Sequence, residues 1–323
     1  MKAAVLGAPI AHSLSPVLHR AAYQALGLAG WSYQAIECDE AGLPGLLAGC
    51  GPDWAGLSLT MPLKRAVLSL LDDAEPLVAE VGAANTVIFD AGRRQGHNTD
   101  VPGMIAALAE SLPPGADGGP GSLAPLARGG DPAALILGAG ATACSALAAV
   151  RGLGLTEATV AVRDPRRAAT LQAAADRLGV TVRLVSFADP GATAPGLLIA
   201  TTPAGAADLY SQRIEAGVLT PRCVLDVVYH PWPTRLAVAA ERSGVPVAGG
   251  FALLLHQAAR QFELMTGKPA PLEAMRAAGL AALPGHPESR RLSGAGTVVS
   301  SGKSRGRVSG AGTVVSVGSH AGG

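Results

Sequence analysis

The sequence is poor in charge, in aromatic side chains and in cysteine, and each shortage excludes some functions. Its 323 residues carry 25 basic and 24 acidic side chains, a formal net charge of +1. A charge so close to zero provides no overall field that would attract nucleic acid or an anionic membrane. Aromatic residues make up only 3% of the chain, which leaves few platforms for stacking single-stranded nucleic acid. We therefore expect neither a nucleic acid nor a membrane as a partner.

Cysteine and histidine show no pattern typical of a metal site. The four cysteines include no CxxC pair, and no cluster of histidine and cysteine has zinc spacing. His12, His97, His230 and His256 also lack the i, i+4 pairing by which one helix face binds a metal. We expect no metal and four reduced thiols in a cytoplasmic protein.

Long uncharged segments are also rare. One of them, residues 133–150, is barely long enough to span a bilayer, and its glycine-rich middle suits a strand, a turn and a helix better. The first residues, MKAAVLGAPIAHS, imitate a signal peptide only faintly, because Gly7 and Pro9 interrupt a short apolar run. Both observations favour a cytoplasmic protein.

Hydrophobic residues, by contrast, make up 49% of the chain, enough to bury a large core. Strand-like segments alternate with helical patterns over residues 1–110 and again over 132–249, on either side of a Gly/Pro-rich segment at 111–131. Such alternation predicts parallel sheets covered by helices. We predict an α/β protein of two domains with a cleft between them. Residues 284–323, in which SGAGTVVS occurs twice, are expected to be a disordered low-complexity tail.

The second alternating run carries a dinucleotide-binding pattern. Gly138, Gly140 and Ala143 form G-x-G-x-x-A between the strand-like ALIL and an expected helix at 141–153. The glycines permit a tight turn and a close approach of a pyrophosphate, and the helix N-terminus attracts its negative charge. A tight strand–helix turn without a ligand is the alternative. The residues expected to line the cofactor here are Gly138, Ala139, Gly140 and Ala141.

The next strand ends in VRDPRR, which affects the choice of cofactor. Arg163, Arg166 and Arg167 crowd the place expected for the adenosine ribose, and guanidinium groups bind a 2′-phosphate well. Asp164 favours NAD instead, because a carboxylate there can hold a free 2′-hydroxyl. It can also simply cap the helix that begins at Pro165. Three arginines against one aspartate favour NADP, with NAD left open.

The first alternating run contains a lysine in an unusual place. The apolar spacing after Pro62 predicts a helix that begins at this proline, so Lys64 would lie in the first turn. There the helix macrodipole disfavours a cation by up to about 1 kcal/mol. A catalytic or binding role for Lys64 would explain this cost, and an ordinary surface lysine is the alternative.

Further polar groups precede two other expected helices. Ser13 and Ser15 stand before Pro16, where two hydroxyls and free backbone N–H groups could hold a carboxylate. The alternative is that Ser15 is simply the N-cap of the helix, a role that requires no ligand. Asp100 follows Asn98 at the start of another helix, and capping is again the simpler alternative.

Taken in order, these blocks resemble the shikimate dehydrogenases, over residues 2–283. The matching blocks are GAPIAHSLSP, GLSLTMPLK, GAANT, HNTD, GAGATA, ATTPAG, DVVYHPWPT and GFALLLHQAARQFELMTG. The resemblance implies a reversible, NADPH-dependent reduction of 3-dehydroshikimate to shikimate, a step of aromatic amino acid and chorismate biosynthesis. It also implies an N-terminal substrate domain, completed by C-terminal helices at about 250–283, and a Rossmann-like NADP-binding domain.

The same motif match implies roles for individual residues. Lys64 and Asp100 correspond to the family's catalytic pair, in which the ammonium donates a proton and the carboxylate holds it in place. The residues that correspond to its substrate-binding groups are Ser13 and Ser15 for the carboxylate, Tyr229 nearby, and Thr60, Asn85 and Gln257 for the hydroxyls. Besides the glycine-rich turn and the three arginines, Thr201 and Gly250 are placed beside the cofactor.

Two departures from the family pattern keep other functions open. Ser58 stands where most members carry asparagine, which removes an amide donor from the substrate site. The VRDPRR segment replaces the usual N-R-T-x-x-R. An NAD-dependent quinate/shikimate dehydrogenase is therefore one alternative. A non-catalytic, ligand-binding regulatory paralogue is another, although such a protein would need neither Lys64 nor Asp100. We expect a monomer or a homodimer.

Overall fold

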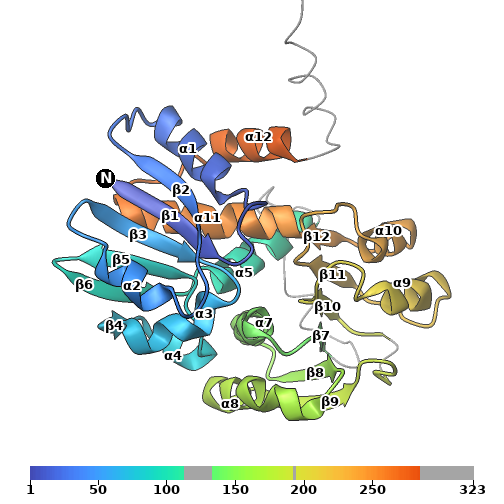
Figure 1. Ribbon diagram of the computed structural model, residues 1–323. Helices are drawn as coiled ribbons and strands as arrows, with labels where there is room; N and C mark the ends of the chain where they lie inside the picture. The colour runs from blue at the N-terminus through green and yellow to red at the C-terminus, as the bar shows by residue number, and fades with distance from the viewer. Residues whose placement is uncertain (113–132, 192–193, 284–323) are drawn as a thin grey trace, which may run out of the picture.

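The computed structural model describes residues 1–112, 133–191 and 194–283. The predicted linker, apart from its first two residues, and the predicted tail lie outside these ranges. The described chain forms two six-stranded sheets, each flanked by helices (Figure 1). The predicted fold class, two α/β units of which the second is Rossmann-like, is confirmed.

The first sheet is mixed, with the strand order β2-β1-β3-β5-β6-β4. Its strands are β1 (Lys2–Gly7), β2 (Ser32–Glu37), β3 (Trp54–Leu59), β4 (Asp73–Ala74), β5 (Thr86–Asp90) and β6 (Arg93–His97). Its helices are α1 (Ser15–Ala25), α2 (Leu43–Ala48), α3 (Leu63–Ala66), α4 (Pro76–Val81) and α5 (Asp100–Ser111), with a 3-10 helix at Val67–Leu70. Strands β1, β2 and β3 run parallel, whereas β5 and β6 form an antiparallel hairpin. The loops that follow β1 and β3 therefore lie at the same edge of the sheet.

The second sheet is entirely parallel, with the strand order β12-β11-β10-β7-β8-β9. Its strands are β7 (Ala134–Leu137), β8 (Glu157–Val162), β9 (Thr181–Ser186), β10 (Leu197–Ala200), β11 (Cys223–Asp226) and β12 (Val247–Gly249). Its helices are α7 (Ala141–Gly152), α8 (Ala169–Leu178), α9 (Asp208–Glu215) and α10 (Arg235–Arg242), with a 3-10 helix at Pro165–Ala168. The first strand of this sheet, β7, is central. Strands β8 and β9 follow on one side of it, and β10, β11 and β12 follow on the other. This creates a switch point between β7 and β10, the place where such sheets bind ligands.

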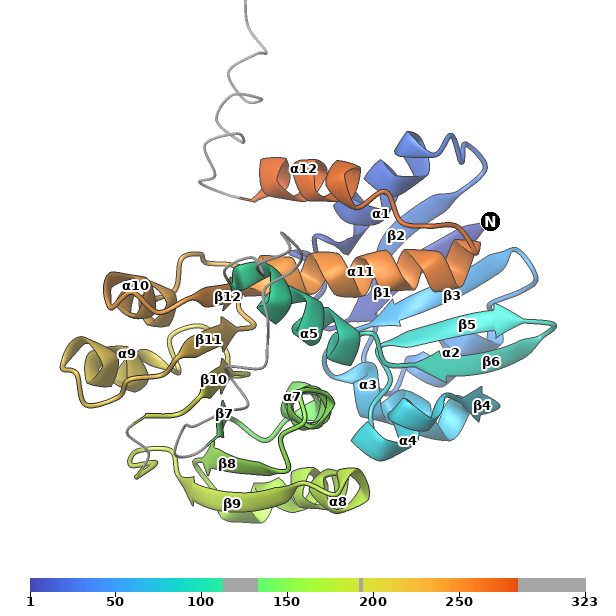
Figure 2. The same cartoon turned by 180° about the vertical axis from the view of Figure 1, so that it is seen from behind.

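The end of the described chain returns to the first sheet. Strand β12 leads directly into α11 (Gly250–Thr266), and α12 (Leu272–Ala282) follows. Figure 2 shows α11 running across the molecule from β12 towards β3 and β5. Leu255 and Phe262 of α11 are buried in one hydrophobic cluster with Leu18 and Tyr23 of α1. Residues of α11 can therefore line a cavity together with the loops of the first sheet.

Two helix starts differ from the sequence prediction. Helix α1 begins at Ser15 with Leu14 in the capping position, so the predicted capping role of Ser15 is wrong. Helix α3 begins at Leu63, one residue after Pro62, and spans four residues before the chain narrows to a 3-10 helix. A macrodipole cost for Lys64 does not apply to such a short helix.

The uncharged segment at 133–150 forms β7 and most of α7, as predicted. In the part of the chain that the structure describes, no helix has the length and apolar character needed to cross a membrane.

Candidate active site

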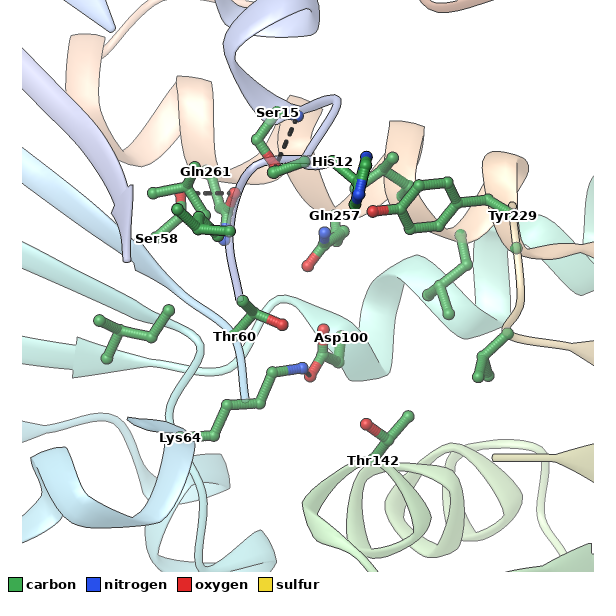
Figure 3. A pocket seen from close by; sticks show the side chains of 18 of the residues that line it. His12, Ser15, Ser58, Thr60, Lys64, Asp100, Thr142, Tyr229, Gln257 and Gln261 are labelled. Carbon is green, nitrogen blue, oxygen red and sulfur yellow. Dashed lines mark hydrogen bonds and ion pairs between the residues drawn. The ribbon is translucent and has the colours of Figure 1, made fainter. Parts of the chain in front are cut away.

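A cavity of about 290 Å³ lies between the two sheets. Most of its lining comes from the loops after β1 and β3, from α5 and from α11, and Thr142 of α7 and Tyr229 after β11 complete it. Figure 3 shows Lys64, Asp100 and Thr60 on one side, Ser15 and His12 on another, and Thr142 facing Lys64 from across the cavity. Residues far apart in the sequence therefore share a single site.

The ion pair between Lys64 and Asp100, which lines the cavity, is the most buried of the ion pairs that the described residues form. Lys64 Nζ lies 2.6 Å from Asp100 Oδ2, and the two side chains are only 15% and 6% exposed. Asp100 does not cap α5, because it is the first residue of the helix, with Thr99 in the N-cap position. The side chain of Asn98 instead accepts at Oδ1 from the N–H groups of Asp100 and Val101, at 3.1 and 3.3 Å. The capping alternative for Asp100 is therefore wrong, and its carboxylate is free to orient the lysine.

Asn85 fixes the other oxygen of this carboxylate. Its Nδ2 donates to Asp100 Oδ1 and to Gln257 Oε1, each at 2.9 Å. Its Oδ1 accepts from the backbone N–H of Thr99 at 2.8 Å, and this contact determines which end of the amide is oxygen. Because Gln257 uses its oxygen on Asn85, it presents its NH2 group to the cavity.

The same cavity contains two residues whose hydrogen bonds lead into the core. Ser58 and Gln261 line it, and their side chains hydrogen-bond each other at 2.8 Å. From the sequence, Ser58 was expected only to remove an amide donor, and Gln261 was not expected in the site. A signal for Gln261 was present, because it follows Gln257 by four residues and so falls on the same helix face.

Ser13, Ser15 and Tyr229 lie towards another end of the cavity, where His12 also lines it. Burial raises the pKa of Tyr229, so its phenol stays protonated and can donate a hydrogen bond. Ser13 Oγ accepts a long hydrogen bond of 3.4 Å from the backbone N–H of Ser15. Hydroxyl donors of this kind suit an anionic or polar ligand group.

The loop that carries Tyr229 is held by a buried carboxylate. Asp226 Oδ2 accepts from Thr234 Oγ1 at 2.6 Å, and Oδ1 accepts from the backbone N–H of Val228 at 3.1 Å. Burial raises the pKa of Asp226, and these two hydrogen bonds oppose the shift only in part. The pair Asp226–Thr234 therefore closes the loop on both sides of Tyr229.

The turn between β7 and α7 fits a dinucleotide. Gly138 has φ of +107°, and a Cβ there would lie 2.9 Å from Thr201 Oγ1, so the turn requires glycine. At Gly140 a Cβ would meet no atom within 4 Å, and no side chain caps the first N–H groups of α7. This leaves open space and free donors at a helix N-terminus, which suits a diphosphate. The hydroxyl of Thr201 is already committed, because it donates to the carbonyl of Leu137 at 2.7 Å.

Gly250 lies where the start of α11 meets the loop after β11. It is the first residue of α11 and lines the cavity, and a Cβ there would lie 2.4 Å from the carbonyl oxygen of Val227. The backbone of α11 can approach this loop closely only because residue 250 is glycine.

The three arginines after β8 behave differently from one another. Arg166 pairs with Asp164 through two contacts, Nε to Oδ1 at 3.0 Å and Nη2 to Oδ2 at 3.1 Å. The Arg166 side chain and its backbone N–H lower the pKa of Asp164. Asp164 also caps the 3-10 helix that begins at Pro165, which was the predicted alternative to a role in binding the ribose. Arg163 and Arg167 are exposed and form no ion pair with any residue that the structure describes.

Comparison with known proteins identifies the family. The model of the shikimate dehydrogenase substrate binding domain matches residues 5–87, and that of the shikimate 5'-dehydrogenase C-terminal domain matches residues 250–278. A shikimate dehydrogenase (NADP(+)) of Symbiobacterium thermophilum is 35% identical over 294 residues, which is 88% of this chain and 95% of the relative. The chain belongs to the shikimate dehydrogenase family.

Solved structures of the shikimate dehydrogenase family have the same fold. The enzyme of Mycobacterium tuberculosis is 40% identical, with a TM-score of 0.72 over 87% of this chain and 98% of that chain. The enzyme of Thermus thermophilus, solved in complex with NADP(H) and shikimate, is 34% identical, with a TM-score of 0.69 over 86% and 98%.

Within this family fold, the predicted site residues form two groups. The group around the cavity contains Ser13, Ser15, Thr60, Lys64, Asp100, Tyr229, Gly250 and Gln257, with Asn85 bonded to two of them. The other group follows the ends of the adjacent strands β7, β8 and β10, and contains Gly138, Ala139, Gly140, Ala141, Arg163, Arg166, Arg167 and Thr201. Three further polar residues line the cavity that were not predicted as site residues, namely His12, Thr142 and Gln261.

Proposed function

We propose that this chain is a shikimate dehydrogenase, which reduces 3-dehydroshikimate reversibly to shikimate with NADPH, a step of aromatic amino acid biosynthesis. The observation that carries the proposal is the buried Lys64–Asp100 pair, with 2.6 Å between Nζ and Oδ2, in a cavity whose opposite side is the start of α7. A proton donor and a dinucleotide-binding turn on either side of one cavity suit a dehydrogenase.

The chemistry divides between the cofactor and Lys64. Bound NADPH supplies the hydride that the ketone carbon accepts. The Lys64 ammonium stabilises the negative charge on the ketone oxygen and transfers a proton to it, so that the C=O bond becomes CH–OH. In the reverse direction neutral Lys64 accepts that proton. Asp100 orients the ammonium through Oδ2, while Asn85 holds Oδ1 in place.

Substrate recognition would use the remaining polar lining. Ser13, Ser15 and the protonated phenol of Tyr229 would donate hydrogen bonds to the carboxylate. Thr60 and Gln257 would bind the hydroxyls, with Gln257 as a donor because its oxygen accepts from Asn85. Asn85 would contribute indirectly, because its amide holds Asp100 and Gln257 in place. This arrangement keeps the carboxylate away from Asp100, whose negative charge would repel it.

The arginines favour NADP over NAD. Arg163 and Arg167 have no carboxylate partner among the described residues and would bind the 2′-phosphate. Asp164 is paired with Arg166, which reduces its repulsion of a phosphate. The second candidate, an NAD-dependent quinate/shikimate dehydrogenase, rests on Asp164, whose carboxylate would hold a ribose hydroxyl if it left Arg166.

We place the substrate domain at residues 1–110 together with α11 and α12, and the cofactor domain at 132–249. The packing of α11 against α1 supports this division. We propose that the chain is a monomer or a homodimer. The four cysteines are free, which suits the reducing cytoplasm.

The test is an initial-rate comparison with the purified full chain. Shikimate and quinate are each offered with NADP and with NAD, and formation of the reduced cofactor is followed by absorbance. We expect shikimate with NADP to give the highest kcat/KM. Higher values for quinate with NAD would establish the second candidate instead. Binding of shikimate without turnover under any condition would overturn both and leave the regulatory paralogue.

A further inference from the structure

One wall of the cavity belongs to a buried chain of hydrogen bonds. Tyr33 Oη lies 2.6 Å from Ser58 Oγ, which lies 2.8 Å from Gln261 Oε1. All three residues are at most 3% exposed, yet Ser58 and Gln261 line the cavity (Figure 3). This series of hydrogen bonds can therefore offer a polar group to a ligand in the cavity, while its remaining contacts are buried in the core.

The orientation of Gln261 follows from Thr86 of β5 and from Asn85, which directly precedes this strand. Its Nε2 lies 3.2 Å from the backbone carbonyl oxygen of Asn85, which can only accept a hydrogen bond. The same Nε2 lies 3.0 Å from Thr86 Oγ1, whose own hydrogen is donated to Asn85 Oδ1 at 2.9 Å. Both hydrogens of the Gln261 amide are thereby placed, and its oxygen faces Ser58.

The directions of the next two bonds follow in turn. Gln261 Oε1 has no hydrogen, so Ser58 must donate its single hydrogen to it. Tyr33 must then donate its own hydrogen to Ser58 Oγ, and burial raises the pKa of Tyr33, which keeps that hydrogen in place. A serine oxygen has two lone pairs, and one of them now accepts from Tyr33. Only a lone pair remains for a ligand in the cavity.

We propose that Ser58 is a specificity-determining residue that accepts a hydrogen bond from a ring hydroxyl of the substrate, and that Gln261 imposes this polarity. The proposal rests on the proposed function, because it takes shikimate and 3-dehydroshikimate as the ligands. Gln257 has the opposite polarity, since its oxygen accepts from Asn85 and its NH2 group faces the cavity. Ser58 is then a fixed acceptor and Gln257 a fixed donor in the same cavity. The acceptor favours a substrate hydroxyl over any group that cannot donate a hydrogen bond.

The experiment uses shikimate analogues in which one ring hydroxyl is replaced by hydrogen or by fluorine. Fluorine can accept weakly but cannot donate, so it separates the two polarities that Ser58 could present. Dissociation constants are measured by calorimetry for wild type and for Ser58→Ala. For the hydroxyl that contacts Ser58, we expect both analogues to bind wild type about 10-fold more weakly than shikimate, the value of one hydrogen bond. In Ser58→Ala this difference between shikimate and the two analogues should disappear.

Two further variants test the role of the buried partners. Gln261→Met frees the Ser58 hydrogen, so the fluorine analogue should gain affinity relative to shikimate. Tyr33→Phe leaves the Ser58 hydrogen on Gln261, so the wild-type order of the analogues should persist. Ser211→Ala is the matched control, because Ser211 is a buried serine of α9, outside the cavity, whose hydroxyl has no hydrogen-bond partner among the described residues. Thermal unfolding verifies that each variant is folded.

The outcomes separate this inference from the proposed function. Failure of wild type to bind shikimate would overturn the proposed function, and the inference with it. Normal binding of shikimate with the same analogue order in wild type and Ser58→Ala would overturn the inference alone. The inference alone would also be overturned if the fluorine analogues of every ring position bound wild type as tightly as shikimate does. Ser58 would then not require a hydrogen-bond donor on the ligand.

Discussion

Asn98, just before α5, donates a hydrogen bond from Nδ2 to Ser145 Oγ of α7 at 3.2 Å, and both residues are buried. The Oδ1 atom of the same amide accepts from the N–H of Asp100. One side chain thus connects the start of the helix that carries Asp100 with the helix that begins at the dinucleotide turn. We expect this contact to fix the distance between the substrate and the cofactor.

Ser145→Ala removes this contact at small cost to packing. A buried hydrogen bond contributes about 1 kcal/mol, so kcat should fall about 3- to 10-fold if the bond is needed in the transition state. The dissociation constant of NADPH, measured by its fluorescence, should change by less than about 2-fold, because Ser145 lies one turn beyond the dinucleotide turn. Ser211→Ala is again the control. A kcat equal to that of the control would show that the contact is merely structural.

The two glycines of the dinucleotide turn should respond oppositely to alanine. Gly140→Ala adds a methyl group that meets no atom of the chain within 4 Å, so the thermal midpoint without ligand should stay within about 2 °C. The methyl would occupy the space proposed for the diphosphate, and the NADPH dissociation constant should rise at least about 10-fold. Gly138→Ala should lower the thermal midpoint itself, because φ is +107° there. Unchanged NADPH binding by Gly140→Ala would place the cofactor elsewhere.

Arg163 and Arg167 should determine cofactor preference. Replacing either with alanine removes a charge-assisted contact, so kcat/KM with NADP should fall about 10- to 100-fold. The value with NAD should change by less than about 3-fold, because NAD has no 2′-phosphate. Asp164→Asn should raise the ratio of NADP to NAD activity only slightly, since Arg166 already neutralises Asp164. A loss of NAD activity in Asp164→Asn would show that this carboxylate binds the ribose after all.

His19 should make the fold sensitive to acid. It is fully buried and stacks on Tyr33 with the ring centroids 4.0 Å apart. Desolvation by burial lowers the pKa of His19 to about 3, and nearby Gln261 opposes this shift only in part. In the unfolded chain the pKa of histidine is about 6.5. The unfolded state therefore binds one proton more between these two values, and stability is lost as the pH falls through that window.

His19→Phe tests this linkage and retains the ring stack. Urea unfolding at several pH values should show a free energy of unfolding that falls less steeply below pH 6.5 in the variant. The difference in slope should approach about 1.4 kcal/mol per pH unit, the value for one proton. Parallel slopes would show that His19 is protonated in the folded state or that the interior opens to water.

The sequence predicted most of what depends on local pattern. The alternation of strands and helices and the glycine-rich turn before α7 are found where the pattern indicates them. The uniformly buried run Ala134–Leu137 is typical of a central parallel strand. These features depend on the spacing of hydrophobic residues and on the residue types in turns, and both can be recognised within a short segment of sequence.

The sequence could not predict which polar groups meet across the cavity. The segment HNTD is compatible with capping by Asp100 or by Asn98. Only the structure shows that Asn98 accepts from the first N–H groups of the helix, while Asp100 pairs with Lys64. The contact of Ser58 with Gln261 joins residues 203 positions apart, so no local spacing indicates it. Pairings of this kind depend on how α11 returns to the first sheet.

The central claim is that Lys64 transfers the proton in a hydride-transfer reaction, and Lys64→Met tests it most directly. Methionine retains most of the side-chain length without the ammonium. The measurement is kcat for shikimate oxidation with NADP, together with the NADPH dissociation constant of the same preparation. The account predicts that kcat falls about 10²- to 10⁴-fold, the usual contribution of a general acid or base, while NADPH binding stays within about 3-fold. A kcat close to that of wild type would contradict it.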